Sequence, residues 1–265
     1  MQIPESTWLR TIDVSQFNNG GKPIPWDTVV PELPKLGIGR VLVRASYGPG
    51  YEDPQFAYNW AALKRLGVPK GAYHAGVPGA SPNLDAHAQQ QSAFFLDVVN
   101  KAGGIQGDDW PILDFEDLGG LTPDQMTLWA SHWLACVDAA VRNSKNPAIF
   151  YSYPAFIAAH MGLYDTLASR PLWLADYPGG TALPTFAPPN VGAWTSYFGW
   201  QYTDALTIPG ITGAVDGSVF AVVVPPPAPA TPPVDVTALE AQVADLTQAN
   251  QTLTTKITHA QQALQ

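Results

Sequence analysis

Eight short runs rich in β-branched and aromatic residues recur between residues 9 and 216, and helical stretches separate the earlier runs. This alternation is typical of β/α units around a parallel sheet or barrel. After Leu172 the connections are rich in Pro, Gly and Thr, so we expect an irregular barrel of the α/β class whose last strands are joined by loops. The predicted strands are Leu9–Val14, Arg40–Ala45, Gly71–His74, Pro111–Phe115, Ala148–Tyr151, Leu172–Ala175, Gly199–Tyr202 and Gly213–Asp216.

Two helix starts can be placed within this pattern. Thr122-Pro123-Asp124-Gln125 combines a capping box with proline in the first turn, and Asp53-Pro54 opens another helix.

A change of composition ends the barrel. Residues 224–234 contain the run VPPPAPATPP, which can form only an extended spacer, so residues 1–223 are predicted to be one domain. Residues 235–265 carry a heptad pattern with one Asn250 in its seam, which predicts a parallel two-stranded coiled coil and a homodimer. A single amphipathic helix docked on the barrel is the alternative. The seam residues are Val236, Leu239, Val243, Leu246, Asn250, Leu253, Ile257, Ala260 and Leu264.

Composition excludes several classes of function. A net charge of -9 opposes binding to a nucleic-acid backbone. The first residues lack the basic and apolar regions of a signal peptide, and no run of about 18 apolar residues predicts membrane insertion. We therefore expect a soluble protein made in the bacterial cytoplasm. The five histidines lack zinc-ligand spacing, and phosphate-loop and nucleophile-elbow motifs are missing, so no metal or cofactor is predicted.

Polar and aromatic residues follow nearly every predicted strand, at the end where a β/α barrel keeps its active site. One such residue alone has a structural explanation, such as a helix cap or a turn, whereas their shared position at one rim is hard to attribute to core packing. The predicted catalytic residues are Asp13, Asp114, Glu116 and Asp216. The predicted substrate-binding residues are Arg44, Tyr73, Tyr151, Trp173, Asp176, Gln201 and Tyr202.

Asp114 and Glu116 are the centre of this prediction. Alternate residues of a strand point the same way, so the two carboxyls face one space with Cα atoms about 6.6 Å apart. Repulsion and partial burial separate their proton affinities, so one carboxyl can act as an acid while the other stays ionised. Glycoside hydrolysis uses such a pair. Carboxylates that cap helices or meet arginines are the structural alternative.

The order of motifs between residues 9 and 221 resembles the family 25 glycoside hydrolases, which are peptidoglycan muramidases. Those motifs are IDVSQF at Ile12, VLVRASYG at Val41, DPQFAYNW at Asp53, GVPKGAYHAG at Gly67, PILDFE at Pro111, AIFYSYPAF at Ala148, LWLADY at Leu172, WQYTD at Trp200 and VDGSVF at Val215. Residues 18–23 depart from the family as an insertion before Trp26, and Asp176 stands where the family more often has another polar residue.

The resemblance implies a flattened, TIM-like barrel that cleaves the β-1,4 bond between N-acetylmuramic acid and N-acetylglucosamine. It implies that Glu116 is the general acid and that Asp13, Asp114 and Asp216 line the cleavage point. Asp114 would be either the nucleophile or the stabiliser of a substrate-assisted step. It further implies a phage endolysin that reaches the cell wall through a membrane pore made by another protein.

Two other functions fit the same residues. One is a catalytically silent wall-binding or virion structural module that multimerises through its heptads. The other is a glycosidase for another polysaccharide of N-acetylglucosamine. Product analysis distinguishes the two enzymes, and wall binding without turnover would indicate the binding module.

Overall fold

The computed structural model describes residues 8–141, 144–162, 167–183, 191, 194 and 196–221. The predicted linker, residues 224–234, and the predicted heptad helix, residues 235–265, lie outside the described residues. The proposed homodimer therefore stays a prediction.

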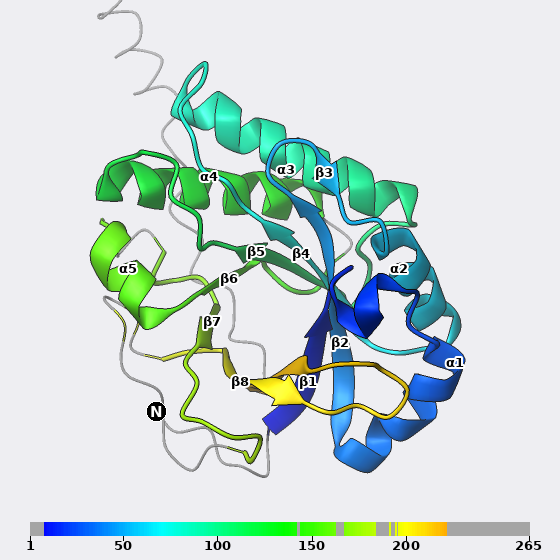
Figure 1. Cartoon of the computed structure of the whole chain (residues 1–265). Coiled ribbons are helices and arrows are strands. Elements are labelled where there is room, and N and C mark those ends of the chain that lie inside the picture. The colour runs from blue at the N-terminus through cyan, green and yellow to red at the C-terminus, as the bar shows by residue number, and fades with distance from the viewer. Residues whose placement is uncertain are drawn as a thin grey trace, which may run out of the picture. The chain divides into compact units, whose positions relative to one another are not determined.

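Eight strands close into a barrel, as the sequence predicts (Figure 1). Around the barrel the order is β1-β9-β8-β7-β6-β5-β4-β2, and parallel pairing of β1 with β2 closes the ring. A short β3 (Tyr51–Glu52) extends β2 as a hairpin. The barrel strands are β1 (Trp8–Val14), β2 (Ile38–Tyr47), β4 (Lys70–Ala75), β5 (Trp110–Asp114), β6 (Ile149–Ser152), β7 (Leu172–Ala175), β8 (Gly199–Leu206) and β9 (Val215–Ala221).

Helices cover the first half of the barrel, where α3 and α4 lie side by side, with α3 against β2 and α4 against β5 (Figure 1). The predicted capping box begins α4: the Thr122 hydroxyl accepts from the Gln125 backbone, and the Gln125 side chain accepts from the Thr122 backbone. The helices are α1 (Trp26–Val29), α2 (Phe56–Arg65), α3 (Leu84–Lys101), α4 (Pro123–Ala140) and α5 (Pro154–His160), with 3-10 turns at Asn18–Gly21, Val30–Glu32 and Pro34–Leu36. None of the described helices has both the length and the apolar character needed to cross a membrane.

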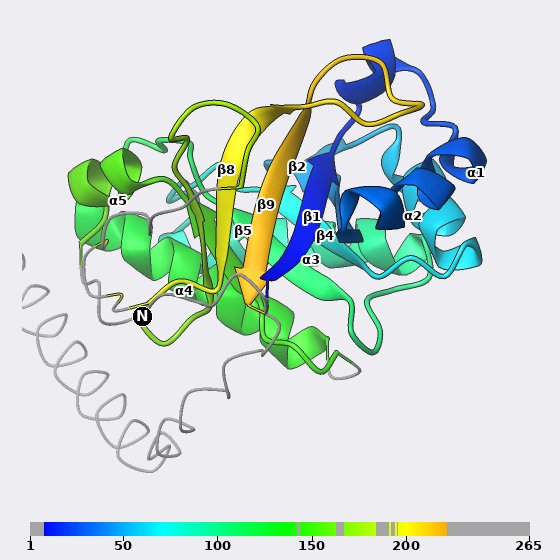
Figure 2. The same cartoon turned by 90° about the horizontal axis from the view of Figure 1, so that it is seen from below.

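The last strand differs from its prediction. We expected Gly213–Asp216 to end at Asp216, whereas β9 begins at Val215 and runs antiparallel to both β1 and β8 (Figure 2). Asp216 therefore lies near the start of its strand. Because the strand is reversed, this start reaches the same rim as the carboxyl end of β1.

The interior of the barrel is filled by large apolar side chains, with Phe220 of β9 at the centre. The Phe220 ring lies 4.8 Å from Trp110, 5.4 Å from Phe198 and 5.5 Å from Trp173 between ring centroids. These contacts come from β5, β7, β9 and the residue before β8, so one ring connects distant parts of the sheet. A second, larger core lies between the sheet and its covering helices and includes Trp60, Phe95, Trp129 and Trp133.

Replacing this central ring should destabilise the barrel strongly. Phe220→Ala should lower the free energy of unfolding by about 3–5 kcal/mol, because it removes a fully buried ring and leaves a cavity. Leu118→Ala is the control, since Leu118 is 59% exposed and its loss should cost less than about 0.5 kcal/mol. Urea unfolding followed by tryptophan fluorescence measures both. Equal losses would contradict the central role of Phe220.

Candidate active site

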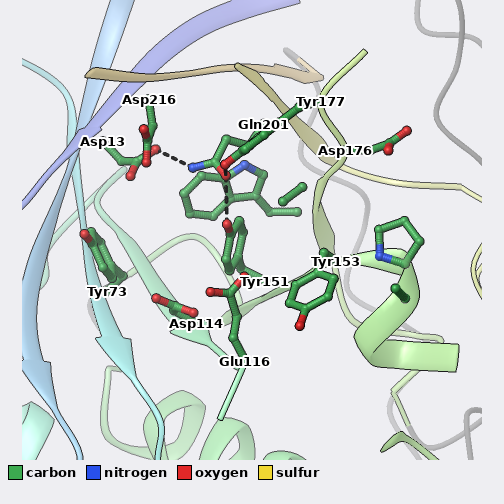
Figure 3. Close-up of a pocket in the computed structure, with 14 residues that line it drawn as sticks. Asp13, Tyr73, Asp114, Glu116, Tyr151, Tyr153, Asp176, Tyr177, Gln201 and Asp216 are labelled. Carbon is green, nitrogen blue, oxygen red and sulfur yellow. Dashed lines mark hydrogen bonds between the residues drawn. The ribbon is translucent and has the colours of Figure 1, made fainter. Parts of the chain in front are cut away.

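A cavity of about 580 Å³ opens at the carboxyl ends of the parallel strands (Figure 3). Every barrel strand except β2 contributes a residue to it, which is the arrangement expected of a β/α barrel active site. Its lining residues are Asp13, Tyr73, Asp114, Glu116, Tyr151, Tyr153, Pro154, Ala155, Trp173, Ala175, Asp176, Tyr177, Gln201 and Asp216.

The predicted pair Asp114 and Glu116 shares this cavity. Asp114 is the last residue of β5, whereas Glu116 follows the strand and is exposed at the cavity mouth. Burial raises the pKa of Asp114 well above its ordinary value, and the nearby charge of Glu116 raises it further. Although Glu116 as a whole residue is exposed, partial desolvation of its carboxyl by surrounding protein raises its pKa. Since each negative charge opposes the other, the pair favours holding one proton, and Glu116 is the member that reaches out toward a ligand.

A second pair, Asp13 and Asp216, stands on the opposite side of the cavity (Figure 3). The two residues are directly opposed in the antiparallel ladder of β1 and β9. Burial and the charge of Asp216 raise the pKa of Asp13 well above its ordinary value, while burial raises the pKa of Asp216 to about 6. A hydrogen bond joins the two side chains, so the pair favours holding a proton between its carboxyls.

An amide connects these groups to the aromatic wall. Gln201 donates to Asp13 over 2.9 Å and accepts from the hydroxyls of Tyr151, at 2.7 Å, and Tyr177, at 2.6 Å. Beneath this layer the indole N–H of Trp173 donates to the Ser218 hydroxyl over 3.1 Å. The indole N–H of Trp173 is therefore already hydrogen-bonded within the protein, and Trp173 lines the cavity with its ring.

Arg44 acts from outside the cavity lining. Its guanidinium forms an ion pair with buried Asp53 over 2.9 Å, lies 4.8 Å from the centre of the Phe17 ring, and lowers the pKa of Asp114 by its charge, although burial and Glu116 outweigh it. We predicted that Arg44 binds substrate, whereas it is not among the residues that line the cavity. Asp53 was taken from the sequence only as part of a helix start.

Tyr202, predicted to bind substrate, does not line the cavity. Its side chain is buried with Trp200 and Val219 on the other side of β8 from Gln201, and its hydroxyl lies 3.4 Å from Arg10. The lining residues that the sequence analysis missed are Tyr153, Pro154, Ala155, Ala175 and Tyr177. Tyr177 directly follows Asp176 at the end of β7, so the rim pattern was a signal for it; Tyr153 and its neighbours follow β6 in the same way.

His74, the residue after Tyr73, does not line the cavity. It is fully buried, its ring is stacked on Trp133, and its nitrogens meet Ser46 at 2.8 Å and Gln91 at 3.0 Å. Burial lowers the pKa of His74 to about 4, so it is neutral and structural. The described residues contain no group of three His, Cys, Asp or Glu side chains placed to hold a metal ion. The chemistry available to the cavity is that of carboxyls and phenols.

Comparison with known proteins places this geometry in context. A model of the glycosyl hydrolases family 25 matches residues 12–211. The chain is 30% identical over 222 residues to the Escherichia coli protein YegX, covering 83% of this chain and 72% of YegX. It is 25% identical over 226 residues to Lysozyme M1 of Streptomyces globisporus, covering 82% of this chain and 69% of the lysozyme.

Solved structures show the same fold. The spore cortex lytic enzyme SleM of Clostridium perfringens is 26% identical with a TM-score of 0.67, covering 84% of this chain and 70% of SleM. The CTP1L endolysin is 27% identical with a TM-score of 0.63, covering 80% of this chain and 66% of the endolysin.

The raised pKa of Asp216 gives a prediction about stability. Between about pH 4 and 6 the native state holds a proton that the unfolded state has lost, so stability falls as pH rises through this window and stays lower above it. Asp216→Asn removes that charge, and its amide oxygen can still accept from Asp13. The variant should gain about 1–2 kcal/mol in free energy of unfolding at pH 7 and nothing below pH 4.

Urea unfolding at both pH values measures the effect. Asp97→Asn is the control, because Asp97 is an exposed carboxylate paired with Lys101 and its change should stay within about 0.5 kcal/mol. A gain for Asp216→Asn that is equal at the two pH values would contradict the proton linkage.

Proposed function

The chain belongs to the glycosyl hydrolases family 25, and from this membership we propose that it is a muramidase that cleaves the glycan strands of bacterial peptidoglycan. The observation that carries the proposal is the pair Asp114 and Glu116, placed together in a cavity at the carboxyl rim of the barrel. The target bond is the β-1,4 linkage from N-acetylmuramic acid to N-acetylglucosamine.

Glu116 is the proposed general acid. It lines the cavity and is exposed, so a glycosidic oxygen between two sugar rings can reach it, and desolvation of its carboxyl raises its pKa, which favours the protonated form that a general acid needs. It gives its proton to the leaving oxygen as the bond to the anomeric carbon breaks, and then takes a proton from the attacking water.

Asp114 is proposed to stabilise the positive charge that develops on the sugar ring. Two routes use it: direct attack on the anomeric carbon, or orientation of the acetamido group of the substrate, which then attacks in its place. Both routes retain the anomeric configuration. The Asp13 and Asp216 carboxyls line the same cavity, so negative charge on this pair would add to the electrostatic stabilisation of the oxocarbenium-like state.

The wall beyond these carboxyls suits a sugar chain. Tyr153 and Tyr177 both line the cavity and remain 37% and 46% exposed, so ring faces are available for the apolar faces of sugars. One solved relative, the autolysin LytC of Streptococcus pneumoniae, is described in complex with a synthetic peptidoglycan ligand. We propose Tyr73, Trp173 and Asp176 as further substrate contacts, since they line the same cavity.

The heptad segment, residues 236–264, is proposed to join two copies of the chain as a parallel coiled coil. Light scattering of the full chain should give twice the monomer mass of 28.4 kDa. Replacing Leu246 and Leu253 by Lys should return the mass to that of a monomer, because two charges would then enter the apolar seam. A monomeric mass for the unaltered chain would contradict the proposal.

Product analysis tests the reaction. Purified peptidoglycan is digested and reduced with borohydride, and the sugar at each new reducing end is identified. Muramitol should form with the unaltered chain and should fall by roughly 10²–10⁴-fold in Glu116→Gln, which keeps the shape of the acid without its proton. Glu32→Gln, in which the altered glutamate is paired with Lys35 away from the cavity, is the matched control and should keep full activity.

Other outcomes would contradict parts of the proposal. Glucosaminitol in place of muramitol would move the cleavage to the other linkage. Wall binding without any new reducing ends would favour a binding module. Full activity in Glu116→Gln would remove that residue as the acid.

A further inference from the structure

Gln201 occupies the centre of a hydrogen-bond network that spans the cavity. Its side chain is 2% exposed and lies in the middle of β8. The amide nitrogen donates to Asp13, while the amide oxygen accepts from Tyr151 and Tyr177. Figure 3 shows Gln201 between Asp13 on one side and Tyr151 on the other. One amide therefore holds three groups of the cavity.

These hydrogen bonds cross strands that are not neighbours. In the order β1-β9-β8-β7-β6, the bond to Asp13 in β1 passes over β9, and the bond to Tyr151 in β6 passes over β7. Backbone pairing cannot connect strands separated in this way. The side chain of Gln201 is thus a direct tie between the strand that carries Asp13 and the strand that carries Tyr151.

The orientation of the Gln201 amide satisfies its three neighbours. Two phenol donors occupy the carbonyl oxygen, which can accept two hydrogen bonds, and an amide nitrogen facing Asp13 suits its carboxyl oxygen. In this orientation each of the three neighbours meets a matching donor or acceptor of the amide. With its oxygen saturated and one N–H used, Gln201 has only one N–H left for a sugar. Most of its hydrogen-bonding groups are therefore used by other residues of the protein.

We propose that Gln201 is a positioning residue for the hydrolysis: it fixes Asp13, and through it the pair with Asp216, at a set distance from Tyr151 and the catalytic carboxyls. This inference rests on the proposed function and revises the prediction that Gln201 binds substrate. Tyr177 completes the arrangement, because it saturates the carbonyl oxygen and joins the segment after β7 to the network.

Gln201→Met separates positioning from substrate binding. Met has a similar length and fills the same space, but it makes none of the three hydrogen bonds. A displaced Asp13 should lower kcat by about 10²-fold on soluble glycan fragments while KM changes less than about threefold. A residue that mainly binds the sugar would instead raise KM and leave kcat near its original value.

Gln201→Glu tests the pH dependence of kcat, which would not change if Gln201 only filled space. Its shape matches the amide, and one oxygen can still accept from Tyr151 and Tyr177. Its other oxygen would face the Asp13 oxygen at the present 2.9 Å, and two oxygens at that distance need a proton between them. The active arrangement then holds one extra proton, which is lost as pH rises. The alkaline limb of the kcat profile should therefore move to lower pH by about one unit.

Two controls accompany these variants. Gln91→Met removes another fully buried amide, one bonded to His74 and Val77, so it should lower thermal stability without moving the pH profile. Tyr58→Phe removes a hydroxyl on α2 that donates to Ile24 and should leave kcat and KM unchanged.

The results separate the two proposals. Loss of kcat in Gln201→Met together with an acid-shifted profile in Gln201→Glu supports the positioning role. A kcat within threefold of the unaltered chain in Gln201→Met, or an unshifted profile in Gln201→Glu, overturns it. If Gln201→Met does not melt cooperatively, the pH profile of Gln201→Glu decides alone. Failure of the unaltered chain to release muramitol would instead overturn the proposed function.

Discussion

The crowding of four carboxyl groups in one partly buried cavity is the constraint on which the rest of this site depends. Two unit charges about 4 Å apart repel by roughly 4 kcal/mol at the effective dielectric near a protein surface, so simultaneous ionisation of Asp13, Asp114, Glu116 and Asp216 is disfavoured. The raised pKa values of these carboxyls favour protonation within each pair, and the charge of Arg44 opposes this by lowering the pKa of Asp114. The same crowding of carboxyls that raises their pKa values therefore also favours the protonated acid that the reaction needs.

The second half of the barrel shows how such a site is held without regular helices. The described helices lie mainly along β2 to β6, whereas β8, β9 and β1 are free of them in the view of Figure 2. Side chains supply the missing connections: Trp173 bonds to Ser218 across β8, and Gln201 bonds to two non-neighbouring strands above that layer. Phe220 packs beneath them. In this half of the barrel, side chains inside the barrel hold the strands together.

Much of this architecture could be predicted from local patterns, because strand runs, the capping box at Thr122 and polar residues after strands all depend on near neighbours in the sequence. The direction of β9 could not, since it depends on pairing with two strands far away in the chain. Tyr202 was misplaced for a simpler reason: adjacent residues of a strand face opposite sides, so Gln201 and Tyr202 could not both reach the cavity. Asp53 gave no signal because its ion pair with Arg44 is tertiary.

The reversed last strand also has a consequence for when the protein becomes active. Asp13 lies in the first barrel strand and Asp216 in the last, and β9 must enter between β8 and β1 before the two carboxyls can meet. A chain growing from its amino end on the ribosome therefore carries Asp114 and Glu116 long before its cavity is complete. The complete set of four acids therefore requires the last barrel strand as well as the first.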